Sequence, residues 1–363
     1  MEKSHVFLVH GMGSCPPGWS ANWQQSIGRL AKNFEPYKGG RALTEDLKFV
    51  EIHYDHVFDG TEAKPGYRRR WNSLATALQD ANLPADVRPA IDLLRSDDPG
   101  HGAAVDFFWT HLLDPLLWYG LLEARKAVLA TVCDQLITGL EAAIAAGARA
   151  HIVAHSLGTS VVHDALVCLT DSDFTQGRLD PFQGGRRWDS LTNVANVARL
   201  LRATRSPSSR LGVADYDPLR SRVHPSDGGL VRRFINIRHR WDPFTFLRTF
   251  GDQLSYGGCQ YFLGLRFAKP LAIHDLETQI ARPDVAAEIL RTVLGNQQFG
   301  RDAEIDAGRP AYNQSFPQTA EAFQAVKTVA GGIGETGDVD LAQLARFLLA
   351  IVNELQKLRT GGP

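Results

Sequence analysis

The sequence has few cysteines, almost no net charge and no long uncharged apolar run. A formal net charge of −1 over 363 residues gives no overall field that favours nucleic acid or an anionic membrane as a partner. No run is long enough to cross a bilayer, and no signal-peptide pattern precedes the first apolar residues. The four cysteines lack metal-ligand spacing and suit a reducing compartment, although four could also pair: Cys15, Cys133, Cys168 and Cys259. We therefore expect a soluble cytoplasmic protein without an integral membrane segment.

The composition is that of a globular protein. Hydrophobic residues make up 44% of the chain and charged residues 22%, which are ordinary values for a folded domain. A chain of this length can form one large α/β domain or two smaller ones. The composition leaves both possibilities open.

One stretch, residues 152–162, has a distinct pattern. Apolar β-branched residues lead into Ser156, which lies between the small residues Ala154 and Gly158, and helical apolar spacing follows. This pattern predicts a strand, a very sharp turn and a helix. Bulky side chains two residues before or after Ser156 would collide across such a turn. A buried strand–helix junction with an incidental serine is the alternative.

This stretch resembles the nucleophile elbow of the α/β-hydrolase family, particularly its lipase and esterase branches. Ala154 stands where the commonest family pattern has glycine. The resemblance implies an α/β-hydrolase fold: a mostly parallel central sheet with helices on both faces, a helical cap or insertion, and a C-terminal helix. It also implies that Ser156 is the nucleophile and that the backbone N–H of Leu157 binds the oxyanion.

The first apolar run, Val6 to Val9, predicts a buried parallel strand that ends in His10 and Gly11. In the resemblance, the second oxyanion N–H arises here, at Met12, because glycine lets the backbone turn toward the developing charge. A simple turn at a strand end is the alternative. We expect His10, Gly11 and also His155 to contribute to substrate binding.

The remaining catalytic groups follow from chain order in the family, which is serine, acid, histidine. Asp242 follows a predicted strand at 232–238 and precedes a proline, which resembles the position of the family's acid. His274 is the only histidine after Asp242, and it follows a predicted strand at 261–267. Three other carboxylates remain rivals for the acid: Asp189, Asp215 and Asp217.

Together these residues imply a serine hydrolase that cleaves a small-molecule or lipid-like carboxylic ester through an acyl-enzyme. Its chemistry requires neither a metal nor an organic cofactor. A thioesterase or an amidase could use the same three residues. A non-catalytic α/β-hydrolase scaffold that binds a ligand or a protein is a further alternative.

The chain also divides by composition. Residues 1–320 are expected to form the hydrolase domain, with a candidate cap or lid at 59–114 and a candidate mobile loop at 203–229. A C-terminal segment, 321–363, contains leucines and isoleucine at helical spacing over 339–358. That amphipathic helix either docks on the body or pairs with a second subunit in a homo-oligomer.

Two segments allow more than one interpretation. Residues 107–119 are rich in large apolar groups, which favours core packing with a contribution to the acyl pocket, or peripheral contact with a lipid surface. His53, Asp55 and His56 predict a loop beside the active site. A metal site is the alternative there, but no third ligand has suitable spacing.

Periodicity predicts the remaining elements. We expect strands at 47–52 and 191–197 and helices at 24–33, 121–146 and 285–294. No internal repeat is present in this pattern.

Overall fold

A computed structural model describes much of the chain. The described residues are 3–11, 15–35, 37–59, 118, 122–169, 187–198, 229–239, 242, 245, 259–263, 276–280, 282–295, 303 and 305.

 The candidate cap (apart from Asp59), the candidate mobile loop (apart from Gly229) and the C-terminal segment lie outside the described residues.

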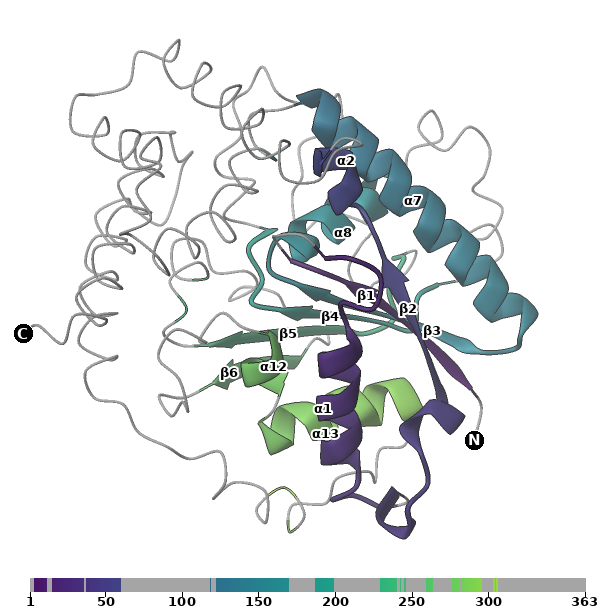
Figure 1. Cartoon of the computed structure of the whole chain (residues 1–363), viewed down its shortest axis with the longest axis vertical. Coiled ribbons are helices and arrows are strands. Elements are labelled where there is room, and N and C mark those ends of the chain that lie inside the picture. The colour runs from purple at the N-terminus through teal and green to yellow at the C-terminus, as the bar shows by residue number, and fades with distance from the viewer. Residues whose placement is uncertain are drawn as a thin grey trace, which may run out of the picture.

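Within the described residues, the strands form one parallel six-stranded sheet in the order β2-β1-β3-β4-β5-β6 (Figure 1). The interior strand β1 pairs with β2 on one side and with β3 on the other, so that Val9 lies beside both Ile52 and Ala154. Every residue of β1 is buried, as expected for a parallel strand covered on both faces. The strands are β1 (Ser4–Val9), β2 (Leu47–Ile52), β3 (Arg149–His155), β4 (Ser190–Val194), β5 (Phe234–His239) and β6 (Cys259–Leu263).

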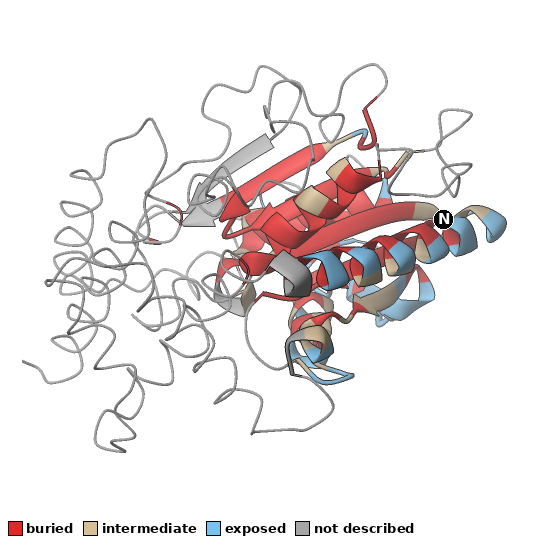
Figure 2. Ribbon diagram, turned by 90° about the horizontal axis from the view of Figure 1, so that it is seen from above, coloured by how far each residue is buried: buried red, intermediate tan, exposed pale blue. Residues whose placement is uncertain are grey.

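Helices cover both faces of this sheet. Helices α7 (Leu122–Ala145) and α8 (Leu157–Cys168) pack together on one face, and α1 (Ala21–Ala31) and α13 (Pro283–Leu294) pack together on the other (Figure 1). Strands β1, β3 and β4 are buried between them, whereas the outer side of α7 is exposed (Figure 2). The short elements are η1 (Tyr37–Gly39), η2 (Leu43–Glu45), α2 (Asp55–Asp59) and α12 (Leu276–Ile280).

Alternate side chains of the strands supply the two halves of the core. Val6 and Leu8 belong to the same buried cluster as Ile27 of α1 and Ile289 of α13. Phe7 points to the opposite face, where a β-carbon on Gly139 of α7 would overlap its ring. Glycine at 139 therefore allows α7 to lie close to the sheet.

Helix α7 is long and apolar enough over Arg125–Ala145 to cross a membrane by length and composition alone. That is weak evidence, because a core helix passes the same test. In the structure α7 contacts α8 and the strands β1, β2 and β3. These contacts are those of a helix that covers a sheet.

The structure confirms the α/β class with a parallel sheet, and it confirms the strand at 47–52 and the helices predicted at 121–146 and 285–294 to within two residues. The helix predicted at 24–33 begins at Ala21 and ends at Ala31. The strand predicted at 261–267 begins at Cys259, and residues 264–267 lie outside the described part.

Three predicted boundaries were wrong. The strand predicted at 191–197 stops at Val194, because Ala195 has a φ of +52°, which a strand cannot accommodate. The strand predicted from residue 232 begins at Phe234. The loop predicted over 53–56 holds for the first two residues only, since Asp55 begins helix α2. Of the apolar segment 107–119, only Trp118 is described, and it is buried.

Candidate active site

Ser156 occupies a sharp turn between β3 and α8. Its φ of +50° and ψ of −124° lie in a region that residues with a β-carbon rarely adopt. The backbone N–H of Ser156 donates a hydrogen bond to the carbonyl oxygen of Val194 at 3.0 Å, which ties the turn to the end of β4. The predicted strand, turn and helix are therefore present, and the serine is held in a strained backbone conformation.

Thr159 connects this turn to the chain that follows β4. Its hydroxyl donates to the carbonyl oxygen of Ser156 at 2.6 Å and accepts from the backbone N–H of Val197 at 3.1 Å. Thr159 is fully buried. One side chain thus satisfies polar groups of two segments, which stabilises the turn at Ser156.

The end of β1 lies directly against the same turn. A β-carbon on Gly11 would lie 2.9 Å from the β-carbon of Ser156 and 3.0 Å from Nδ1 of His155. A β-carbon on Gly158 would overlap the carbonyl oxygen of His10. Both glycines are needed for this close approach, since real β-carbon contacts are longer.

This contact lies where the strand order reverses. From β1 the chain crosses to β2 on one side, and it later returns to add β3 on the other side. In open parallel sheets, ligands bind outside the carboxyl ends of the strands at such a switch point. Ser156 follows the carboxyl end of β3, and His10 and Gly11 follow that of β1. Ser156, His10 and Gly11 thus meet at the switch point, where open parallel sheets bind their ligands.

Leu157 is the first residue of α8, after Ser156 at the N-cap position. The first N–H groups of a helix have no partner within the helix and lie at its positive end. The N–H of Leu157 is therefore available to a developing negative charge near Ser156. Met12, the other predicted oxyanion residue, lies outside the described residues.

His10 is buried and packed between two aromatic rings. Its imidazole stacks on Tyr54, with ring centroids 4.1 Å apart and planes 6° from parallel, and Trp19 meets it edge-on. Nε2 of His10 lies 3.9 Å from a carboxylate oxygen of Asp55. Burial lowers the pKa of His10 to about 4, although the nearby Gly11 carbonyl and Asp55 oppose this shift. The ring is therefore neutral at pH 7.

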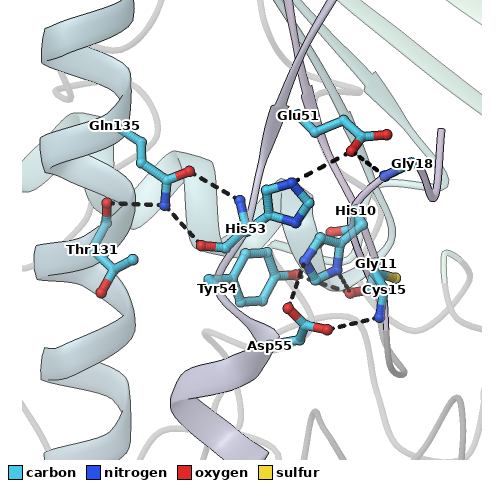
Figure 3. A network of polar contacts seen from close by, with 10 residues as sticks. All are labelled: His10, Gly11, Cys15, Gly18, Glu51, His53, Tyr54, Asp55, Thr131 and Gln135. Atoms are coloured by element: carbon cyan, nitrogen blue, oxygen red, sulfur yellow. Dashed lines mark hydrogen bonds and ion pairs between the residues drawn. The ribbon is translucent and has the colours of Figure 1, made fainter.

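Two carboxylates, one within β2 and one at the start of α2, anchor the loop after β1 (Figure 3). Asp55 accepts a hydrogen bond from the backbone N–H of Cys15 at 2.7 Å. Glu51 accepts from the Ser20 hydroxyl at 2.6 Å and from the N–H groups of Gly18 and Ser20 at 2.7 and 2.8 Å. Burial opposes ionisation of Glu51, but the Ser20 hydroxyl, these two N–H groups and the neighbouring His53 lower its pKa. Sequence patterns did not reveal these anchors, because they depend on β1 and β2 lying side by side.

His53 and Gln135 extend this network to α7. The side-chain oxygen of Gln135 accepts from the N–H of His53 at 3.0 Å, and its amide nitrogen donates to the carbonyl oxygen of His53 at 2.7 Å (Figure 3). Among the described residues, no group of three or more histidine, cysteine, aspartate or glutamate side chains could hold a metal ion. The segment from Glu51 to Asp55 serves here to hold the loop after β1.

Asp242 lies three residues beyond the end of β5 and is fully buried. Thr245 donates to the Asp242 carbonyl oxygen from its backbone N–H at 3.1 Å and from its hydroxyl at 3.0 Å. β5 is two strands away from β3, a separation of about 10 Å at the usual strand spacing. That span suits an imidazole placed between a serine and a carboxylate. His274 lies outside the described residues.

The rival acid Asp189 lies at the amino end of the strands, opposite to the end at which Ser156 lies. It immediately precedes β4, where its carboxylate accepts from the N–H of Ala150 at 2.9 Å, near the start of β3. This is the amino end of the strands, away from Ser156. The other two rivals, at positions 215 and 217, lie outside the described residues.

Comparisons of the chain with protein-family models, with curated proteins and with solved structures found no match. The case for a function therefore depends on the residues and geometry described above.

Proposed function

We propose that this protein is a serine hydrolase that cleaves carboxylic esters, with Ser156 as its nucleophile. The observation that carries the proposal is the backbone of Ser156, which is strained at φ +50° between β3 and α8. Strain of this kind persists only where the surrounding structure enforces it, and it is typical of functional sites. A serine in this turn has its neighbouring N–H at the start of a helix, as acyl transfer requires.

The strand order supports the α/β-hydrolase fold as part of this proposal. Ser156 follows β3, Asp242 follows β5 and His274 comes after β6 along the chain. The order serine, acid, histidine is that of the α/β-hydrolase family. Ser156 and Asp242 both follow the carboxyl ends of parallel strands, which meet at the same end of the sheet. His274 lies outside the described residues.

In the proposed mechanism, Ser156 attacks the ester carbonyl while His274 takes its proton. Asp242 orients the imidazole and stabilises its protonated form. The N–H groups of Leu157 and Met12 bind the oxyanion, and loss of one such donor typically costs about 2.7–4 kcal/mol of transition-state stabilisation. His274 then protonates the leaving alcohol, and water releases the acid from the acyl-enzyme.

Labelling with a fluorophosphonate probe tests the nucleophile and its activation together. Such probes react with a serine activated by its neighbours. We expect the wild type to be labelled and both Ser156→Ala and His274→Ala to remain unlabelled. Ser26→Ala in α1 is the control, since it removes a serine hydroxyl outside the site and should leave labelling unchanged. Labelling that survives Ser156→Ala would identify a different nucleophile.

A matched set of substrates tests the bond that is cleaved. An ester, a thioester and an amide with the same acyl group differ only in the leaving group. We expect the largest kcat/KM for the ester, and a larger value for the thioester or the amide would reassign the activity. If a folded wild type neither reacts with the probe nor cleaves any of the three, the proposed enzymatic function is wrong.

A further inference from the structure

We propose that Thr159 is a positioning residue for the oxyanion site: its hydroxyl fixes the orientation of the peptide that joins Ser156 to Leu157. This inference rests on the proposed function, because it concerns the N–H group of Leu157 that would bind the oxyanion. It gives Thr159, which lies in the first turn of α8, a task in the reaction besides its contribution to the stability of the turn.

Thr159 donates two hydrogen bonds to the same carbonyl oxygen. Its backbone nitrogen lies 2.9 Å from the oxygen of Ser156, and its hydroxyl oxygen lies 2.6 Å from it. A carbonyl oxygen has two lone pairs, and these two donors can occupy both. One residue therefore holds the Ser156 carbonyl from two directions.

Fixing this carbonyl also fixes the next N–H. A peptide bond is planar and trans, so the N–H of Leu157 points opposite to the carbonyl of Ser156. The carbonyl is directed into the first turn of α8, so the N–H is directed out of the N-terminal end of the helix. Among the described residues, no acceptor is bonded to that N–H. Hydrogen bonds to the carbonyl also polarise the peptide, which strengthens its N–H as a donor.

The chain that follows β4 sets the direction of the Thr159 proton. The backbone N–H of Val197 donates to the Thr159 hydroxyl oxygen at 3.1 Å. A hydroxyl has one proton, and that proton is directed to the Ser156 oxygen while the hydroxyl oxygen accepts from Val197. Thr159 is fully buried, so bulk water does not compete for either bond.

Val197 is itself held by bonds to β5. The N–H of Ala195 donates to the carbonyl oxygen of Ile237 at 2.9 Å. The side-chain amide of Asn196 donates to the side-chain oxygen of Asn236 at 3.1 Å. Ile237 and Asn236 both belong to β5, the strand that precedes the proposed catalytic acid. The hydroxyl that orients the oxyanion donor is therefore connected to the strand that leads to the acid.

The variant Thr159→Val tests this role because it removes the hydroxyl and keeps the shape of the side chain. With p-nitrophenyl butyrate as substrate, we expect kcat to fall about tenfold while KM changes less than about twofold. Deletion of an oxyanion donor costs more, about 10²–10³ in kcat, whereas here the N–H of Leu157 remains and only its alignment is impaired. A trifluoromethyl ketone, which forms an oxyanion adduct with serine, should lose affinity by about the same factor as kcat.

Two further variants separate positioning from stability. Thr159→Ser keeps the hydroxyl, so we expect its kcat and ketone affinity to stay within about twofold of the wild type. Ser4→Ala is the matched control, since the buried Ser4 hydroxyl also donates to a backbone carbonyl, that of Val293, at 2.6 Å. Ser4 begins β1, at the end of the sheet opposite to Ser156. We expect folded Ser4→Ala to have the kcat and ketone affinity of the wild type.

The outcomes distinguish this inference from the proposed function. If Thr159→Val has the kcat and ketone affinity of the wild type, or only its KM rises, the positioning role is wrong while the hydrolase proposal stands. The same holds if Ser4→Ala loses as much kcat as Thr159→Val, because lost stability would then explain both. A wild type that is inert toward both the ester and the fluorophosphonate probe overturns the proposed function and this inference together.

A second comparison serves if Thr159→Val fails to fold. Thr159→Ser and Thr159→Cys differ in one atom, and a thiol is a much weaker hydrogen-bond donor than a hydroxyl. We expect the serine variant to have a larger kcat and a tighter ketone complex than the cysteine variant. Equal values for the two would contradict the need for a hydroxyl donor at the Ser156 carbonyl.

Discussion

Gly158, two residues after Ser156, packs against the carbonyl group of His10 at the end of β1. A β-carbon there would overlap that oxygen and lie 2.8 Å from the carbonyl oxygen of Val9. These carbonyl groups belong to the backbone at the end of the interior strand β1, and they cannot move aside as a flexible side chain can. We expect Gly158→Ala to lower the free energy of unfolding by about 1–3 kcal/mol, measured by urea denaturation.

Gly28→Ala in α1 is the control for this substitution. A β-carbon on Gly28 would meet nothing within 4 Å. Alanine favours a helix interior over glycine, so this variant should gain about 0.5–1 kcal/mol. If the two variants shifted stability in the same direction, the close approach of Gly158 to His10 would not be the cause.

The backbone conformation of Ser156 predicts that glycine at this position gives a more stable protein than alanine. Glycine tolerates a positive φ, whereas alanine keeps the strain caused by a β-carbon. We expect Ser156→Gly to be more stable than Ser156→Ala by about 1 kcal/mol, with urea denaturation as the measurement. At Ser160, inside α8, the order should reverse, because glycine weakens a helix interior.

The hydroxyl of Thr159 makes a testable contribution to the turn. Thr159→Val keeps the shape but leaves the N–H of Val197 and the carbonyl of Ser156 without this partner. We expect a loss of about 1–3 kcal/mol in the free energy of unfolding. Thr159→Ser retains the hydroxyl and should lose less; a serine variant as unstable as the valine variant would argue for packing of the methyl group instead.

His151 makes the stability of the protein depend on pH. Burial, and to a lesser extent Arg149, lowers its pKa in the folded state to about 3. Below about pH 6.5 the unfolded chain takes up a proton that the folded chain does not, so this group lowers stability as the pH falls until about pH 3. Between pH 7 and pH 5 the loss amounts to about 2 kcal/mol.

Denaturation of wild type and His151→Asn at both pH values measures this contribution. The substitution removes the titrating ring, so the variant should lose about 2 kcal/mol less than the wild type between pH 7 and pH 5. Its absolute stability is not the test, because the substitution also changes packing. Equal losses in the two proteins would mean that His151 is protonated in the folded state as well.

Much of the central fold could be predicted because its signals are local. The strand at 47–52 and the helix at 285–294 carry their own periodicity, and the turn at Ser156 requires small neighbours. The early end of β4 could not be predicted, since Ala195 gives no sign of a positive φ and is held by a backbone bond to Ile237 across the sheet.

The candidate site could be predicted only in part, because some of its contacts join residues that are far apart in the sequence. Ser156 and Gly11 lie in recognisable turns, and their adjacency follows from the pairing of β1 with β3. The Tyr54 hydroxyl, in contrast, contacts the carbonyl oxygen of Gly11, which lies 43 residues away along the chain. No spacing in the sequence specifies such a contact.

The pairing of Val9 with Ala154 also has a consequence for folding. Contacts between residues so far apart in the chain form slowly, because the entropy of closing the intervening loop is lost before the contact stabilises anything. During synthesis, β1 and β2 emerge long before β3, and the switch point remains open until β3 arrives. A chain interrupted before residue 149 would hold Glu51, Asp55 and Gly11 without Ser156 beside them.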